Sequence, residues 1–161
     1  MLLELEEAID LLQEFNGVSV TVRVLLAAVL GGLVGSERGR RGRAAGMRTH
    51  VLVCLGAAMT SMVGLYSAEV LGFTNDPLRV SAQVISGIGF LGAGTIMTRN
   101  HAQITGLTTA AGLWATASLG LCIGTGFYGG VLAAFLVILV TMVALPSLER
   151  KRRTRREYVC Y

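Results

Sequence analysis

The residues whose spacing most resembles a binding motif are the glycines of the string GIGFLGAG, residues 87–94. The string has the glycine pattern of a dinucleotide-binding loop, in which the backbone approaches a pyrophosphate closely. Such a loop also needs an acid about 20 residues further on, which binds the ribose. No Asp or Glu occurs between Asp76 and Glu149, so this interpretation is rejected. In an apolar segment, glycines instead let helix backbones approach each other. The predicted helix-packing positions are Gly35, Gly87, Gly89, Gly92 and Gly94.

Glu37 and Arg38 stand where an apolar segment gives way to a basic loop that also includes Arg48 and Thr49. One interpretation is an interfacial charge cluster that sets the topology and contacts anionic lipid. The other is that Glu37, the single acid among these arginines, forms a buried ion pair or a cation-linked site. The sequence leaves both open, and it leaves a metal site undecided.

Four other side chains with hydrogen-bonding groups interrupt apolar segments, namely Gln83, Thr108, Thr109 and Trp114. In lipid, such groups usually hydrogen-bond between helices, at about 0.6–2 kcal/mol each; lining a polar cavity is the alternative. Trp114 falls near the middle of its segment, so we expect it to pack against other helices, with a partner for its indole N–H.

Motifs of ATP-driven chemistry are missing from the sequence, which has no nucleotide-binding P-loop and no DKTGT phosphorylation string. The three cysteines fit no zinc site or disulfide framework. We therefore predict that the chain is not an enzyme and holds no cofactor. The basic C-terminal tail follows directly on an apolar segment, which explains its charge without nucleic acid as a partner.

The elements that must position these residues are long apolar helices. Hydrophobic residues make up 53 % of the chain, and residues 50–147 contain only four charged side chains, Glu69, Asp76, Arg79 and Arg99. A soluble fold of this size needs a more polar surface. A helix that crosses the hydrocarbon core needs about 20 apolar residues. Five segments qualify, and they predict an all-α polytopic membrane protein: residues 18–35, 51–72, 80–97, 107–124 and 128–145.

The connections between these segments predict local structure and orientation. The last two segments are joined so closely that they should form an antiparallel hairpin, and Pro146 is expected to end the fifth helix. Residues 2–15 are predicted to form a short acidic amphipathic helix. Alternation of five spans places the arginines of the first loop, Arg99 and the basic tail on one side, which should be the cytoplasm. Arg23 is expected to snorkel from the outer end of the first span.

This organisation divides the chain into three parts. Residues 1–17 form an acidic periplasmic N-terminus, residues 18–147 a transmembrane domain, and residues 148–161 a basic cytoplasmic tail. The predicted topology has the N-terminus outside and the C-terminus inside, in a bacterial inner membrane. The expected partners are the lipid bilayer and anionic lipid at the cytoplasmic face. A membrane-protein partner and a homo-oligomer stay open.

Three blocks of the sequence resemble the MgtC/SapB family of membrane proteins: GGLVGSERGRRGRAAGMRTHVLVCLGAA, SAQVISGIGFLGAGTIM and ITGLTTAAGLWATASLGLCIG. The resemblance covers roughly residues 25–148. It implies a five-helix inner-membrane protein linked to magnesium homeostasis, stress adaptation and virulence. Carried over by position, the family's signature includes Gly35, Glu37, Arg38, Arg48, Thr49, Gln83, Gly87, Gly89, Gly92, Gly94, Thr108, Thr109 and Trp114.

Two functions are compatible with these features. Some family members are described as negative regulators of the membrane ATP synthase, so the resemblance implies a regulator that acts through helix contacts with a membrane partner. The expected partner is the ATP synthase or a transport ATPase. The alternative is a magnesium transporter or channel that works as an oligomer. Mg²⁺ prefers hard oxygen ligands and loses its water reluctantly. No acid lies in the middle of any predicted span, which counts against transport by a monomer.

Overall fold

The computed structural model describes residues 13–74, 76–99 and 103–157. Most of the predicted N-terminal amphipathic helix lies outside these ranges. The described chain consists of five long helices and one short hairpin: α2 (Gly17–Arg40), α3 (Met47–Glu69), α4 (Leu78–Thr95), β1 (Met97–Arg99), β2 (Gln103–Thr105), α5 (Leu107–Gly124) and α6 (Tyr128–Glu157). The all-α prediction is confirmed. The antiparallel hairpin, in which Thr98 pairs with Ile104, stands where the sequence predicted only a loop.

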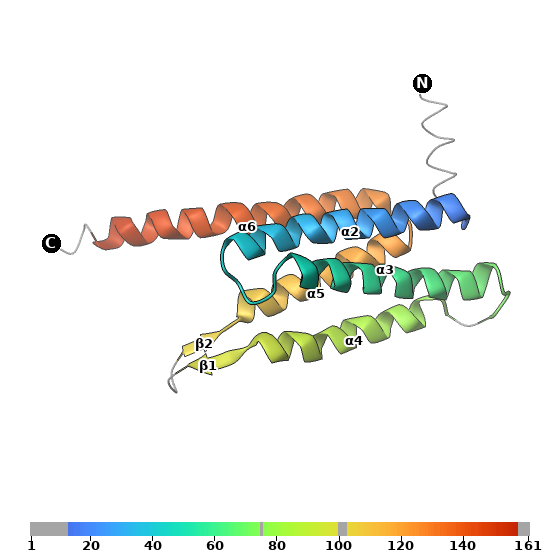
Figure 1. Ribbon diagram of the computed structural model, residues 1–161, viewed down its shortest axis with the longest axis horizontal. Helices are drawn as coiled ribbons and strands as arrows, with labels where there is room; N and C mark the ends of the chain where they lie inside the picture. Colours follow the sequence, from blue (N-terminus) through green and yellow to red (C-terminus); the bar gives the residue numbers. More distant parts are fainter. Residues whose placement is uncertain (1–12, 75, 100–102, 158–161) are drawn as a thin grey trace, which may run out of the picture.

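Successive helices run in opposite directions and lie side by side (Figure 1). In this view α3 and α5 lie at the centre, α2 and α6 cover one side, and α4 covers the other. The α2–α3 loop, the hairpin and the C-terminal end of α6 all lie at one end of the bundle. We call this end the basic end, because the arginines of the first loop and the basic C-terminal segment belong to it.

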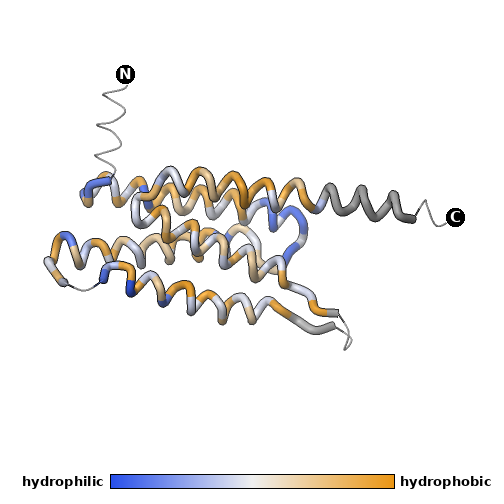
Figure 2. Tube along the Cα trace, turned by 180° about the vertical axis from the view of Figure 1, so that it is seen from behind, coloured by the Kyte–Doolittle hydropathy of each residue, from blue (hydrophilic) through white to orange (hydrophobic). Residues whose placement is uncertain are grey.

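Four of the described helices are long and apolar enough to cross a membrane, namely α2, α3, α5 and the Tyr128–Pro146 part of α6. Orange, apolar stretches run along most of the bundle in Figure 2. The remaining predicted span, residues 80–97, is the third in the chain and corresponds to α4, which is not long and apolar enough to be counted with these four. It has 18 residues and carries an arginine, a glutamine and several glycines and serines. Whether α4 also crosses the bilayer therefore stays a prediction, although it lies alongside the other four (Figure 1).

Glycines allow α2 and α5 to pack closely against the central helix α3. A Cβ atom built on Gly31 of α2 would lie 2.8 Å from the His50 carbonyl oxygen. A Cβ on Gly120 of α5 would lie 2.9 Å from the Ala57 Cβ, and one on Gly124 would be 2.6 Å from the Ser61 Cβ. These separations are shorter than van der Waals contact, so a larger residue would force the helices apart.

The prediction that Pro146 ends the last helix is wrong, because α6 continues through it to Glu157. Proline has no N–H to offer the carbonyl of Met142, four residues earlier in the helix. Near this interruption, the guanidinium of Arg41 donates a hydrogen bond from Nη2 to the Val143 carbonyl, at 3.2 Å. A donor from the residue that follows α2 thus reaches the α6 backbone one residue beyond the carbonyl that the proline cannot serve.

The expectation that Arg23 snorkels outward is also wrong, because its side chain is only 1 % exposed. Its Nη1 donates to the Gly124 carbonyl at 2.9 Å, and its Nη2 donates to the Gln13 carbonyl at 3.0 Å. Its Nε lies 3.3 Å from the Tyr128 hydroxyl oxygen. Carbonyls at the C-terminus of a helix attract a cation. The end of α5 therefore binds this arginine inside the bundle.

Candidate functional site

Arg38 is a buried cation at the basic end of the bundle. It lies in the last turn of α2 and is 4 % exposed. Its Nη2 donates a hydrogen bond to Thr109 Oγ1 at 2.6 Å, which links α2 to the first turn of α5. Its Nε is buried and has no hydrogen-bond partner. The structure thus brings together two residues of the predicted site, and it leaves one donor of the guanidinium unsatisfied.

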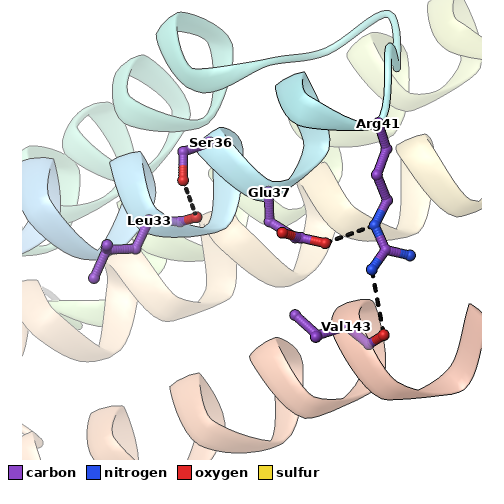
Figure 3. Close-up of polar contacts among 5 residues, drawn as sticks. All are labelled: Leu33, Ser36, Glu37, Arg41 and Val143. Carbon is purple, nitrogen blue, oxygen red and sulfur yellow. Dashed lines mark hydrogen bonds and ion pairs between the residues drawn. The ribbon is translucent and has the colours of Figure 1, made fainter. Parts of the chain in front are cut away.

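The Glu37 carboxylate pairs with Arg41 and not with Arg38. Arg41 Nε lies 2.6 Å from Glu37 Oε1, one helical turn away, and Figure 3 shows the pair between α2 and α6. The same Arg41 side chain donates to the Val143 carbonyl of α6 (Figure 3). The sequence predicted a buried ion pair as one role for Glu37. The pair is only half-buried, with 19 % of the Glu37 side chain and 30 % of the Arg41 side chain exposed.

His50 is a buried polar residue that the sequence analysis did not single out. It lies in the first turn of α3 and is fully buried. Its Nδ1 is 3.0 Å from the Gly46 carbonyl oxygen, and its Nε2 has no hydrogen-bond partner. A Cβ on Gly112 of α5 would come within 3.8 Å of this Nε2. An ionisable residue at the end of a membrane helix is a signal that could have found it.

A cavity of about 450 Å³ opens between α2, α5 and α6 at the basic end. Its polar lining consists of three arginines, one carboxylate and two hydroxyls: Glu37, Arg38, Arg41, Arg43, Thr108 and Thr141. Its apolar lining comes from α5 and α6 and includes Ala111, Ala115, Val137, Ile138, Met142 and Leu145. We call this cavity the basic cavity. It gathers Glu37, Arg38 and Thr108, which are far apart in the sequence, into one space.

A second group of predicted residues lies on another face. Arg48, Thr49 and Gly87 line an apolar groove of about 530 Å³ between α3, α4 and α5. Gln83 is exposed on α4. Trp114 is 51 % exposed, so the expectation that it packs among the helices of this chain is wrong. Glu37, Arg38 and Thr108 thus line one space and Arg48, Thr49 and Gly87 another, so the predicted site residues do not form one centre.

The glycines of α4 differ from those of α2 and α5 in what surrounds them. A Cβ on Gly87, Gly89 or Gly94 would meet nothing within 4 Å, whereas one on Gly92 would touch the Ala110 Cβ at 3.4 Å. A Cβ on Gly35 of α2 would lie 2.9 Å from the Gly46 carbonyl oxygen. Of the five predicted packing positions, Gly35 and Gly92 therefore contact a neighbouring segment within the described chain, whereas Gly87, Gly89 and Gly94 are exposed.

The chemistry of the basic cavity favours anions over metal ions. Within the described ranges, no three side chains of the types His, Cys, Asp or Glu come together. Glu37 is the one carboxylate that lines the cavity, and it is already paired with Arg41. A Mg²⁺ ion needs several oxygen ligands and is repelled by neighbouring guanidinium groups. The arginines and hydroxyls are donors, which suit phosphate or carboxylate oxygens.

Four apolar helices that pack side by side define a multi-pass membrane protein surrounded by lipid. The MgtC family model matches residues 24–151, and the chain belongs to this family.

Three relatives show how far the similarity extends. The chain is 46 % identical to YhiD of Escherichia coli (strain K12) over 127 residues, which cover 76 % of this chain and 59 % of YhiD. It is 42 % identical to MgtC of Salmonella typhimurium (strain LT2) over 130 residues, covering 81 % of this chain and 54 % of MgtC. It is 35 % identical to SapB of Bacillus subtilis over 136 residues, covering 82 % and 59 %. The chain thus spans little more than half the length of these relatives. No solved structure matches it.

Proposed function

We propose that this chain is a regulatory protein of a bacterial inner membrane, linked to magnesium homeostasis and stress adaptation. It acts by docking α4 against a transmembrane helix of a partner, for which the membrane ATP synthase is the first candidate. Family membership supports the link to magnesium, since one relative, YhiD, has a name that describes it as a proposed magnesium transporter. The exposed face of α4 supports the other part of the proposal, which is that a partner helix docks on this chain.

The observation that carries the proposal is a stripe of small residues on α4. Ala82, Ser86, Gly89 and Ala93 follow the spacing of one helix face, and all four are exposed. A Cβ on Gly89 would meet nothing within 4 Å. In lipid, such a stripe lets a second helix approach until backbone atoms touch, and van der Waals contact then stabilises the pair. The described part of this chain places no helix there.

Two glycine variants separate docking from folding. Gly89→Leu adds a large side chain to the exposed stripe and should prevent a partner helix from approaching. Gly120→Leu is the control for folding, since it adds the same side chain where α5 already touches α3. We expect the first variant to stay folded and lose regulation, and the second to lose folding.

The assay measures ATP-driven proton pumping in inverted membrane vesicles that contain each variant at equal levels. The wild-type chain should reduce pumping, and Gly89→Leu should restore it. Normal pumping in the presence of the wild-type chain would contradict the ATP synthase as partner. If Gly89→Leu regulates as well as wild type, docking through α4 is wrong.

Magnesium transport by an oligomer is the second candidate, and the name of YhiD favours it. The test is Mg²⁺ flux into proteoliposomes that contain only this protein. Flux above that of empty liposomes would displace the regulatory proposal.

The proposed topology has the basic end in the cytoplasm. A reporter that is active only in the cytoplasm should work when fused after Arg156 and fail when fused near Asp76. The reverse pattern would overturn the orientation.

A further inference from the structure

We infer that the basic cavity between α2, α5 and α6 is a binding site for one anionic phospholipid. Its phosphate would lie among the arginines, and an acyl chain would lie along the apolar wall. This inference concerns a different face from α4 and does not depend on the proposed function. It is also more specific than a general attraction between the basic end and an anionic membrane surface.

Charge is the first argument. The lining combines three guanidinium groups with one carboxylate, which leaves two net positive charges. The Glu37 carboxylate is engaged with Arg41, and no described carboxylate pairs with Arg38. A buried cation without a counter-ion is costly, since the charge has lost its water and gained little in return. An anion in the cavity would supply the missing charge.

Hydrogen-bonding capacity is the second argument. Arg38 is 4 % exposed, uses Nη2 for Thr109, and keeps a buried Nε with no partner. The hydroxyls of Thr108 and Thr141 line the same space from α5 and α6. Guanidinium and hydroxyl groups from three helices can together surround the oxygens of a phosphate, and charge-assisted bonds of this kind are strong.

The apolar wall identifies the ligand as a lipid. Val137, Ile138 and Leu145 line the cavity from α6, a helix in whose spanning part few residues are buried. A soluble phosphate would gain nothing from this wall, whereas an acyl chain would contact it without leaving the hydrocarbon. A volume of about 450 Å³ also exceeds what a phosphate group fills and lies in the range of small-molecule sites.

Basic pockets between transmembrane helices on the cytoplasmic side are known to suit acidic lipid head groups. Phosphatidylglycerol is therefore the probe lipid, with phosphatidylcholine as a zwitterionic control of equal chain length. The experiment measures the thermal stability of the purified, delipidated protein in detergent as each lipid is titrated. Phosphatidylglycerol should raise the melting temperature in a saturable manner, by the linkage of binding to folding. Phosphatidylcholine should have a much smaller effect.

Three variants test the location of the site. Arg43→Gln removes a cation from the lining, and Arg40→Gln is its control, because Arg40 is exposed nearby and does not line the cavity. Arg43→Gln should weaken lipid binding about five-fold, the factor expected for one basic residue near an acidic lipid, and Arg40→Gln should not. Ala115→Met changes no charge but fills the apolar part of the cavity, so it should also weaken binding.

Several results would overturn the inference. Equal stabilisation by phosphatidylcholine would show that the head-group charge is irrelevant. Equal stabilisation by inorganic phosphate would replace the lipid with a soluble anion. Equal losses in Arg43→Gln and Arg40→Gln, with no loss in Ala115→Met, would reduce the effect to the general charge of the basic end.

Discussion

Gly120→Ala should destabilise the protein, although alanine forms helices more readily than glycine. A Cβ at this position would lie 2.9 Å from the Ala57 Cβ and closer still to the Cys54 carbonyl oxygen. The first of these distances is at least about 0.6 Å shorter than an optimal carbon–carbon contact. Cys54 contributes backbone atoms, which cannot rotate away, so α5 and α3 must separate.

The steric cost of the Cβ at Gly120 can be measured by comparing Gly120→Ala with a matched variant, Gly87→Ala. A Cβ on Gly87 would meet nothing within 4 Å, so that substitution adds a methyl group without a clash. Both changes gain the same helix propensity, up to about 1 kcal/mol. Their difference therefore isolates the steric cost at Gly120, which we expect to be about 1–3 kcal/mol.

Thermal unfolding in one detergent, followed by size-exclusion fluorescence, measures this difference. A chain of this size loses about 2–4 °C in melting temperature for each kcal/mol. Gly87→Ala should melt at or above the wild-type temperature, and Gly120→Ala clearly below it. Equal melting temperatures for the two variants would refute the close contact of α5 with α3.

Three further predictions follow from individual side chains. Arg23→Met should lower the free energy of unfolding by about 2–4 kcal/mol, because hydrogen bonds from a buried cation to backbone carbonyls are lost. The control Arg79→Met, at an exposed position, should leave the melting temperature nearly unchanged in the same assay. A double-mutant cycle of Glu37→Gln with Arg41→Gln should show a coupling of at most about 1 kcal/mol, as expected for a partly exposed pair. Strict additivity would mean that the pair contributes nothing. In liposomes, brominated lipid should quench the fluorescence of the single tryptophan, Trp114, and protection from quenching would indicate that another chain covers this face.

The positions of the helices could be predicted from the sequence because they depend on runs of apolar residues. The predicted spans 107–124 and 128–145 agree closely with α5 and with the apolar part of α6. The connection between them has glycine where the backbone requires it, since Gly126 has a φ of 75°. The end of α6 could not be predicted in the same way. A proline usually stops a helix, but here the Arg41 side chain from another helix donates to the backbone close to it.

The faces of the helices were much harder to predict. A helix that is apolar all round gives no periodic signal for the side that packs inward. Trp114 was placed among the helices by its depth in the segment, but depth does not fix rotation, and the side chain is half exposed. The partner of Glu37 is a related case. Arg38 is its neighbour in the sequence, yet Arg41 lies one turn away on the same side of the helix and forms the pair.

The burial of Arg23 bears on how charge orients this protein. The rule that places arginines in the cytoplasm counts the lysines and arginines in loops and near the ends of membrane spans. Arg23 belongs to the N-terminal part of α2 and contacts the C-terminal residue of α5, so in the proposed topology it would oppose that rule if it were exposed. The Gly124 and Gln13 carbonyls accept its hydrogen bonds inside the fold. It therefore links α2 to the end of α5 by hydrogen bonds, and in the proposed topology the outer end of the folded bundle has one exposed cation fewer.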